Sequence, residues 1–226
     1  MEVLLKWDRS LFLQLNGLHS GWGDTVMLFF TRKESWLPLY LMLLFLFIRN
    51  YRGKSWLIII FILTGLVVSD QLTGIIKELV QRYRPGYNPV IRDLTHVVLR
   101  KGGEYGFPSS HAANTFFVMT FTGYLFRNRY SLFTLLCWAL LVSYSRIYTG
   151  AHFPLDILAG WMIGIGVGWL FFRLMMWVEM KASGSRRKIK IKPLPDSQAG
   201  MLALLLVTVI LTLLSAVYIL HKYDLL

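Results

Sequence analysis

The chain has 226 residues, of which 55% are hydrophobic and 16% are charged, and its mean hydropathy is +0.52. A soluble domain carries about a quarter charged residues, so this composition excludes an ordinary soluble protein. The formal net charge of +12 would suit nucleic acid, but the basic residues lie between apolar blocks and not along one helix, which argues against that partner. The sequence predicts an all-α fold, a polytopic helical bundle in a membrane.

The N-terminal forty residues predict an amphipathic helix that lies along the membrane interface. Leu11, Leu15 and Leu18 have the spacing of one helical face. Charged residues interrupt this segment, and it offers no continuous apolar run of the ~20 residues that a crossing needs. We therefore expect it to lie on the bilayer and not to cross it.

Six apolar blocks follow and predict about six transmembrane helices. The first is short unless the upstream "TVMLFF" extends it past Arg32, Lys33 and Glu34, so five crossings remain an alternative. The blocks are 36–48, 56–76, 112–126, 131–144, 153–178 and 201–220.

Basic loops predict the orientation. Segments 49–54, 127–130 and 181–192 follow the first, third and fifth blocks and are rich in Lys and Arg, so we expect all three on the cytoplasmic side. The loop 77–111 is also basic but falls on the opposite side, so it needs a functional explanation. These features predict a multi-pass protein of the cytoplasmic (inner) membrane whose polar chemistry faces the periplasm or exterior.

The same features divide the chain into three parts. Residues 1–180 hold the polar motifs, 181–198 form a basic cytoplasmic tether, and 199–226 form an additional C-terminal transmembrane helix.

Three short motifs share the predicted outer face. In "KELVQRYRP", Lys77 and Arg84 are seven residues apart, so on a helix both would project from the same side. "PSSH" ends at His111, and its Pro108 and Ser109 suit a helix start, where free N–H groups favour an anion.

The third motif, "SRIYTGAHFPLD", joins two apolar blocks. Arg146 closes the fourth block, and His152 and Asp156 are spaced i, i+4, so the carboxylate can reach the imidazole and fix its tautomer. Together the motifs offer three cations, helix-end amides, two histidines and a carboxylate. This set suits a tetrahedral oxyanion such as phosphate, with one histidine attacking and the other protonating the leaving oxygen. The sequence has no carboxylate cluster or metal-type histidine spacing, so we expect no metal and no cofactor.

The joint pattern K-x6-R-P, P-S-S-H and S-R-x5-H-x3-D resembles the type 2 phosphatidic acid phosphatase superfamily. The resemblance implies a phosphatase in which His152 forms a phosphohistidine, Asp156 orients it and His111 is the general acid. It also implies the phosphate-binding residues, which are Lys77, Arg84, Ser109, Ser110 and Arg146. Ser110 stands where the family often has glycine, and its backbone amide would make the main contact.

Several substrates and functions remain open at this stage. A site at the bilayer surface suits a lipid phosphate, and the candidates are undecaprenyl diphosphate, a lipid A phosphate, phosphatidylglycerol phosphate and phosphatidic acid. The loop 87–107, with basic Arg92, Arg100 and Lys101, is expected to carry selectivity and to meet a second phosphate. A transporter would spread polar residues through several blocks, whereas Asp70 alone clearly does so. A vanadium peroxidase relative would be soluble. No obligate protein partner is evident.

Overall fold

The protein is all-α, as the sequence predicts. The computed structural model describes residues 2–98, 102–182, 189 and 191–223. Within these ranges the α-helices are α1 (Glu2–Asn16), α2 (Gly21–Thr31), α3 (Leu37–Tyr51), α4 (Ser55–Val80), α5 (Ser110–Phe126), α6 (Arg129–Tyr148), α7 (Pro154–Ala182) and α8 (Asp196–Lys222). Short 3-10 turns are η1 (Glu34–Trp36), η2 (Arg52–Lys54), η3 (Pro85–Tyr87) and η4 (Arg92–Leu94).

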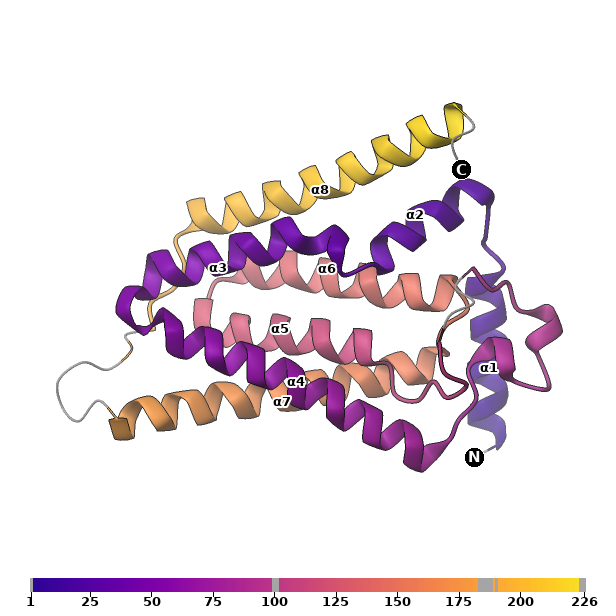
Figure 1. Ribbon diagram of the computed structural model, residues 1–226, viewed down its shortest axis with the longest axis horizontal. Coiled ribbons are helices and arrows are strands. Elements are labelled where there is room, and N and C mark those ends of the chain that lie inside the picture. The colour runs from indigo at the N-terminus through magenta and orange to yellow at the C-terminus, as the bar shows by residue number, and fades with distance from the viewer. Residues whose placement is uncertain (1, 99–101, 183–188, 190, 224–226) are drawn as a thin grey trace.

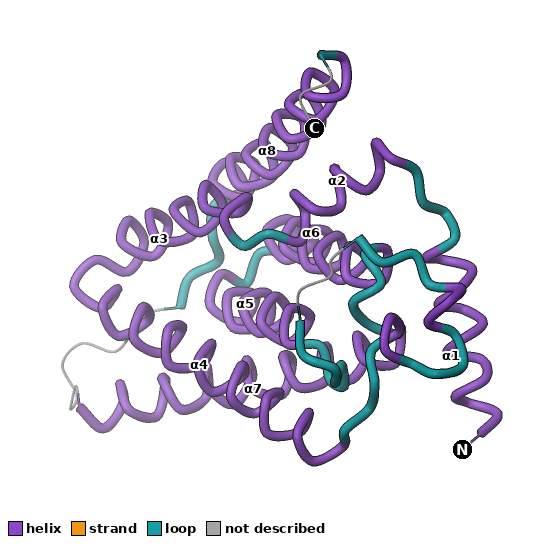
Figure 2. The backbone as a smooth tube through the Cα atoms, turned by 45° about the vertical axis from the view of Figure 1, so that its right-hand side comes forward, coloured by secondary structure: helices purple, strands orange, loops and turns teal. Residues whose placement is uncertain are grey.

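The helices α3 to α8 form a bundle, and α1 lies across one end of it (Figure 1). Helix α5 is central and packs against α4, α6 and α7, while α8 covers the outside of α6, α2 and α3. The loop between α4 and α5 gathers beside α1 at the same end of the bundle (Figure 2). The basic turns that follow α3 and α5, and the C-terminal end of α7, lie at the opposite end (Figure 1).

Among the described residues, four stretches are long and apolar enough to cross a membrane, so this is a multi-pass membrane protein. They are Glu34–Val80, Arg129–Tyr148, Pro154–Ala182 and Asp196–Lys222. The first contains both α3 and α4, which fold back on each other at η2 (Figure 1). Helix α5 has 17 residues, most of them buried between its neighbours. The number of crossings stays a prediction.

A stripe of glycines on α7 lets α5 approach it closely. A Cβ on Gly160 would lie 2.6 Å from the Ser109 carbonyl oxygen, and one on Gly164 would lie 2.3 Å from that of Ala113. Gly168, the next residue in the stripe, faces Phe117 and Thr120 in the same way. Small residues at i, i+4 and i+8 allow two membrane helices to pack backbone to backbone. This contact matters because α5 and α7 begin next to the polar motifs.

The amphipathic N-terminal segment is helical, but the residues that it buries against the bundle are not the leucines of the predicted face. Leu11 and Leu18 are 45% and 70% exposed, which suits a lipid-facing surface. The buried residues are Asp8, Phe12 and Asn16, spaced i, i+4 and i+8. Thus α1 presents Leu11 outward and a mixed polar and aromatic stripe to the bundle, and Leu15 of the predicted face is partly buried beside that stripe.

The C-terminal helix is fastened to the bundle near its start. The Leu194 amide donates to the Phe126 carbonyl oxygen (2.7 Å), and the Asn128 side chain donates to Leu194 and Asp196. Residues 183–188 and 190 of the expected tether lie outside the described residues. The three-part division of the chain stays a prediction.

Candidate active site

The first motif does not form one helical face, so the predicted common projection of Lys77 and Arg84 is wrong. Helix α4 ends at Val80 because Gln81 adopts a left-handed conformation (φ 49°), and Arg84 lies beyond it in extended backbone. The loop then turns back. The Arg84 amide donates to the Glu104 carbonyl oxygen (2.8 Å), and its side-chain Nε donates to Tyr105 (3.1 Å). Hydrogen bonds within the loop between α4 and α5 therefore place Arg84 at the site, and the helical periodicity of α4 does not.

The second motif starts α5, as predicted. Ser109 is the N-cap, and its hydroxyl accepts from the Ala112 amide at 3.5 Å. Its own amide donates to the Asp156 carbonyl oxygen (2.9 Å), which ties the start of α5 to α7. The Ser110 hydroxyl contacts Lys77 Nζ (2.6 Å) and Thr73 Oγ1 (2.7 Å). The lysine of the first motif is thus held at the helix start formed by the second.

The third motif wraps His152 back onto the end of α6. The amides of Ala151 and His152 both donate to the Arg146 carbonyl oxygen, at 3.0 and 3.2 Å. Gly150 adopts φ +73°, and a Cβ there would lie 2.6 Å from the His96 carbonyl oxygen. A left-handed conformation with so close a backbone neighbour requires glycine. This turn aims His152 into the protein, where it is 2% exposed.

His152 and Asp156 face each other, with Nδ1 and Oδ2 separated by 3.6 Å. Asp156 is fully buried and also accepts from the Phe153 amide through Oδ2 (2.9 Å). Burial lowers the pKa of the His152 imidazole well below its usual range, and the charges of Arg146 and Arg84 lower it further. At neutral pH the ring is therefore uncharged, and one of its nitrogens keeps a lone pair.

Arg146 is buried next to this turn. Its Nη1 donates to Thr31 Oγ1 of α2 (2.6 Å), while its Nε has no hydrogen-bond partner among the described residues. A buried guanidinium N–H without a partner is costly unless an anion meets it. This is the donor that a bound oxyanion would satisfy.

Gly106 lies in the loop between α4 and α5, at the point where this loop contacts the third motif. A Cβ on Gly106 would lie 3.0 Å from Arg84 Cγ, 3.1 Å from Asp156 Oδ2 and 3.5 Å from His152 Nδ1. The absence of a side chain thus allows the loop to close over the histidine and its carboxylate.

His111, in the first turn of α5, completes the cluster. It directly follows Ser110, whose hydroxyl contacts Lys77 Nζ, so it lies at the helix start where the first two motifs meet. It also lines a cavity of about 680 Å³, together with Thr31, Lys33 and apolar residues of α3, α4, α5 and α6. The structure therefore brings all three motifs to one place beside an apolar cavity.

Asp70, the polar residue inside the second apolar block, bonds a neighbouring helix. Its Oδ1 accepts from the Asn114 side chain of α5 at 3.3 Å. This contact joins α4 to α5.

Two charged residues near the site were missed by sequence reasoning. Arg82 Nη1 donates to Asp156 Oδ1 at 2.7 Å, and its Nη2 pairs with Asp8 of α1. Arg82 lies inside the first motif but at a position that the pattern leaves free. Asp8 is 74 residues away and gives no signal beyond being a polar residue on a helix.

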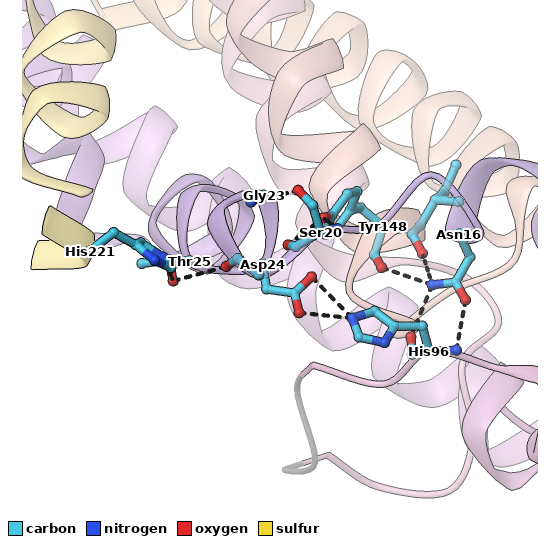
Figure 3. A network of polar contacts seen from close by, with 10 residues as sticks. Asn16, Ser20, Gly23, Asp24, Thr25, His96, Tyr148 and His221 are labelled. Carbon is cyan, nitrogen blue, oxygen red and sulfur yellow. Dashed lines mark hydrogen bonds and ion pairs between the residues drawn. The ribbon is translucent and has the colours of Figure 1, made fainter. Parts of the chain in front are cut away.

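The loop between α4 and α5 is anchored by a separate polar network (Figure 3). His96 Nε2 contacts both Asp24 carboxylate oxygens, at 3.0 and 2.9 Å, and the Asn16 side chain joins His96 to the Tyr148 carbonyl oxygen. The His19 ring stacks on His96 with 3.8 Å between centroids. This network fixes the described part of the loop 87–107 against α1, α2 and α6. Arg100 and Lys101 lie outside the described residues.

Comparison with known proteins agrees with the geometry. The family model described as the PAP2 superfamily matches residues 53–180, a region that contains all three motifs. The chain belongs to the PAP2 superfamily. The predicted resemblance is thereby confirmed, and the protein is a membrane-embedded phosphatase of PAP2 type.

Three relatives of this PAP2 protein illustrate the range of the family. It is 36% identical over 206 residues to a lipid A 4'-phosphatase of Bacteroides thetaiotaomicron, covering 89% of this chain and 88% of that protein. It is 26% identical to the undecaprenyl-diphosphatase BcrC of Bacillus subtilis, covering 73% and 82%. The crystal structure of Aquifex aeolicus LpxE superimposes with a TM-score of 0.54 at 25% identity, covering 73% of this chain and 93% of that one.

The described residues contain no group of three or more His, Cys, Asp or Glu side chains suited to a metal ion. A reaction without metal or cofactor stays a prediction for this PAP2 phosphatase.

Proposed function

We propose that this protein is a lipid phosphatase that hydrolyses a phosphate of a lipid A-type glycolipid through a phosphohistidine on His152. One observation carries the proposal. The three motifs meet at one end of the bundle, His152 faces the Asp156 carboxylate at 3.6 Å, and His111 lines an apolar cavity of about 680 Å³. A site for soluble phosphates would not need an apolar cavity at its edge.

In the first step, His152 attacks phosphorus through Nε2, because Nδ1 points toward Asp156. A bond forms between Nε2 and phosphorus as the bond from phosphorus to the lipid oxygen breaks. Positive charge develops on the ring, and Asp156 stabilises it by accepting from Nδ1–H. The present separation of 3.6 Å is long for a hydrogen bond, but such contacts often shorten when substrate binds.

His111 supplies the proton that the departing lipid oxygen needs. In the second step water attacks phosphorus, His111 takes the proton from that water, and the bond to His152 breaks. Inorganic phosphate leaves and both histidines return to their starting forms. This exchange of roles follows from microscopic reversibility, and proton transfer of this kind contributes about 10²- to 10⁴-fold to the rate.

The phosphate oxygens are held by Lys77, Arg84 and Arg146, the three cations of the motifs. The unpartnered Nε of Arg146 supports this role most directly. Lys77 already lies at the N-terminus of α5 through the Ser110 hydroxyl. The first-turn amides after Ser109 and the helix dipole add donors for an anion there. For Ser109, whose amide is bonded to Asp156, the remaining donor is its hydroxyl.

The lipid tail would enter the cavity that His111 lines. Its volume falls within the range of ~300–1,000 Å³ typical of ligand pockets, so it accommodates part of an acyl chain and leaves the remainder in the bilayer. Lipid A is favoured because a relative of that specificity matches nearly the whole chain. Undecaprenyl diphosphate is the second candidate, supported by the similarity to BcrC.

We infer that the site faces the periplasm or exterior. The basic turns after α3 and α5 lie at the opposite end of the bundle (Figure 1), and such loops stay cytoplasmic.

The test is phosphate release by purified protein from lipid A, undecaprenyl diphosphate, phosphatidylglycerol phosphate and phosphatidic acid. Lipid A should be turned over fastest, and His152→Ala should abolish release. His221→Ala, which changes an exposed histidine of α8, is the matched control and should retain activity. Equal release by His152→Ala and the unaltered protein would contradict the mechanism, and preference for another lipid would contradict the substrate.

A further inference from the structure

We propose that Asp8 and Arg82 are positioning residues that hold Asp156 in line with His152. The inference rests on the proposed function, because it assigns a role in the reaction of the same site. It makes the N-terminal helix α1, which lies outside the matched region 53–180, a working part of the active site.

Arg82 bridges two buried carboxylates. Its Nη1 donates to Asp156 Oδ1 at 2.7 Å and its Nη2 donates to Asp8 Oδ2. The side chains of both aspartates are at most 1% exposed, and that of Arg82 is 18% exposed. A planar guanidinium with a fixed fork of donors sets the relative orientation of two carboxylates in a way that lysine cannot.

This grip determines which way Asp156 points. With Oδ1 bound by Arg82 and Oδ2 bound by the Phe153 amide at 2.9 Å, the carboxylate cannot rotate without losing a bond. Oδ2 therefore stays directed toward Nδ1 of His152, 3.6 Å away. Without Arg82 the carboxylate would keep one anchor and gain freedom to turn.

Asp8 holds Arg82 and the start of α7 at the same time. Its Oδ1 accepts from the Leu155 amide in the first turn of α7 (2.9 Å), where a carboxylate is favourable to the helix dipole. Phe12, one turn further along α1, packs edge-on against Phe153 with 5.2 Å between ring centroids. The Arg82 guanidinium lies over that same Phe153 ring at 4.5 Å. Phe153 directly follows His152, so α1 contacts the segment just after the nucleophile at two points, Phe153 and Leu155.

The experiment compares Asp8→Asn and Arg82→Lys with Glu2→Gln in lipid A hydrolysis. Glu2 is the matched control because it is an exposed carboxylate on α1, the same helix as Asp8. Asp8→Asn and Arg82→Lys should lower kcat by about 10- to 100-fold, the size of effect that follows loss of an outer partner of a metal-bound histidine. KM should change little, because orientation of the nucleophile acts on the chemical step. Glu2→Gln should keep both parameters.

A double mutant separates positioning from simple structural support. If Asp8 acts through Asp156, then Asp8→Asn should have little further effect on kcat in an Asp156→Asn background. The same fold loss in both backgrounds would overturn the proposal. An unchanged kcat in Asp8→Asn would overturn it as well, whatever happens to the thermal unfolding midpoint.

A readout without substrate keeps this test apart from the proposed function. Diethylpyrocarbonate modification, followed by mass spectrometry, reports how well each histidine is held and shielded. His152 should react faster in Asp8→Asn than in the unaltered protein. Each of the exposed histidines His19 and His221 should react at the same rate in both proteins. An unchanged rate at His152 counts against positioning. Failure of the unaltered protein to release phosphate from any lipid counts against the proposed function alone.

Discussion

The glycine stripe on α7 offers a sharp test of how helix packing sets the active site. Replacing Gly164 with alanine would put a Cβ 2.3 Å from the Ala113 carbonyl oxygen, whereas ordinary contact begins at 3.4 Å. The obstacle is backbone, which cannot rotate away as a flexible side chain would, so α5 and α7 must part locally by about 1 Å. Overpacking of this kind costs about 1–3 kcal/mol in stability.

The loss of activity should exceed what the loss of stability explains. Ala113 lies two residues after His111, and α7 begins two residues after His152. Parting the helices therefore separates the two histidines, and a misplacement of about 1 Å can lower a rate by about 100-fold. We expect Gly164→Ala to lower kcat by one to two orders of magnitude at a temperature where it is still folded.

Gly166→Ala is the matched control, because Gly166 lies on the same helix and a Cβ there would meet nothing within 4 Å. The assay is phosphate release from lipid A by both variants in detergent, with the thermal unfolding midpoint measured in parallel. Gly166→Ala should match the unaltered protein in both. Equal kcat for Gly164→Ala and Gly166→Ala would refute the claim that close packing of α5 on α7 aligns the site.

Three further outcomes are expected. Gly150→Ala should lower both activity and unfolding midpoint, because φ +73° and a Cβ 2.6 Å from the His96 carbonyl oxygen are incompatible with a side chain; Gly74→Ala, with nothing within 4 Å, should not. Burial lowers the pKa of His152, so the acid limb of kcat/KM should fall below ~6.5, the usual pKa of imidazole; an acid limb above that value would contradict a buried neutral nucleophile. As the pH falls, the unfolded chain therefore protonates this histidine at a higher pH than the folded chain does. The stability that neutral His152 contributes is complete above about pH 6.5 and is lost as the pH falls toward the lower pKa of the folded state. A cysteine at exposed Gly103, in a Cys137→Ser background, should react with an impermeant thiol reagent on intact cells; reaction only after permeabilisation would invert the orientation.

The sequence alone determined the helical class, most helix positions and the members of the three motifs. Apolar runs predicted 56–76 and 201–220, and the structure has α4 at Ser55–Val80 and α8 at Asp196–Lys222. These features could be read because each depends on local composition, since a bilayer requires a continuous apolar segment whatever its neighbours are. The start of α5 at Ser109 was likewise readable from a local cap.

Only the tertiary structure decided how the charged groups are paired. The seven-residue spacing predicted that Lys77 and Arg84 project from the same side of a helix. In the structure α4 ends at Val80, and hydrogen bonds within the following loop place Arg84 at the site. It also gave no reason to join Asp8 to Arg82. The energy of a buried ion depends on which opposite charge the fold brings to it. For Asp8 that partner is 74 residues away, and helical periodicity carries no information over such a separation.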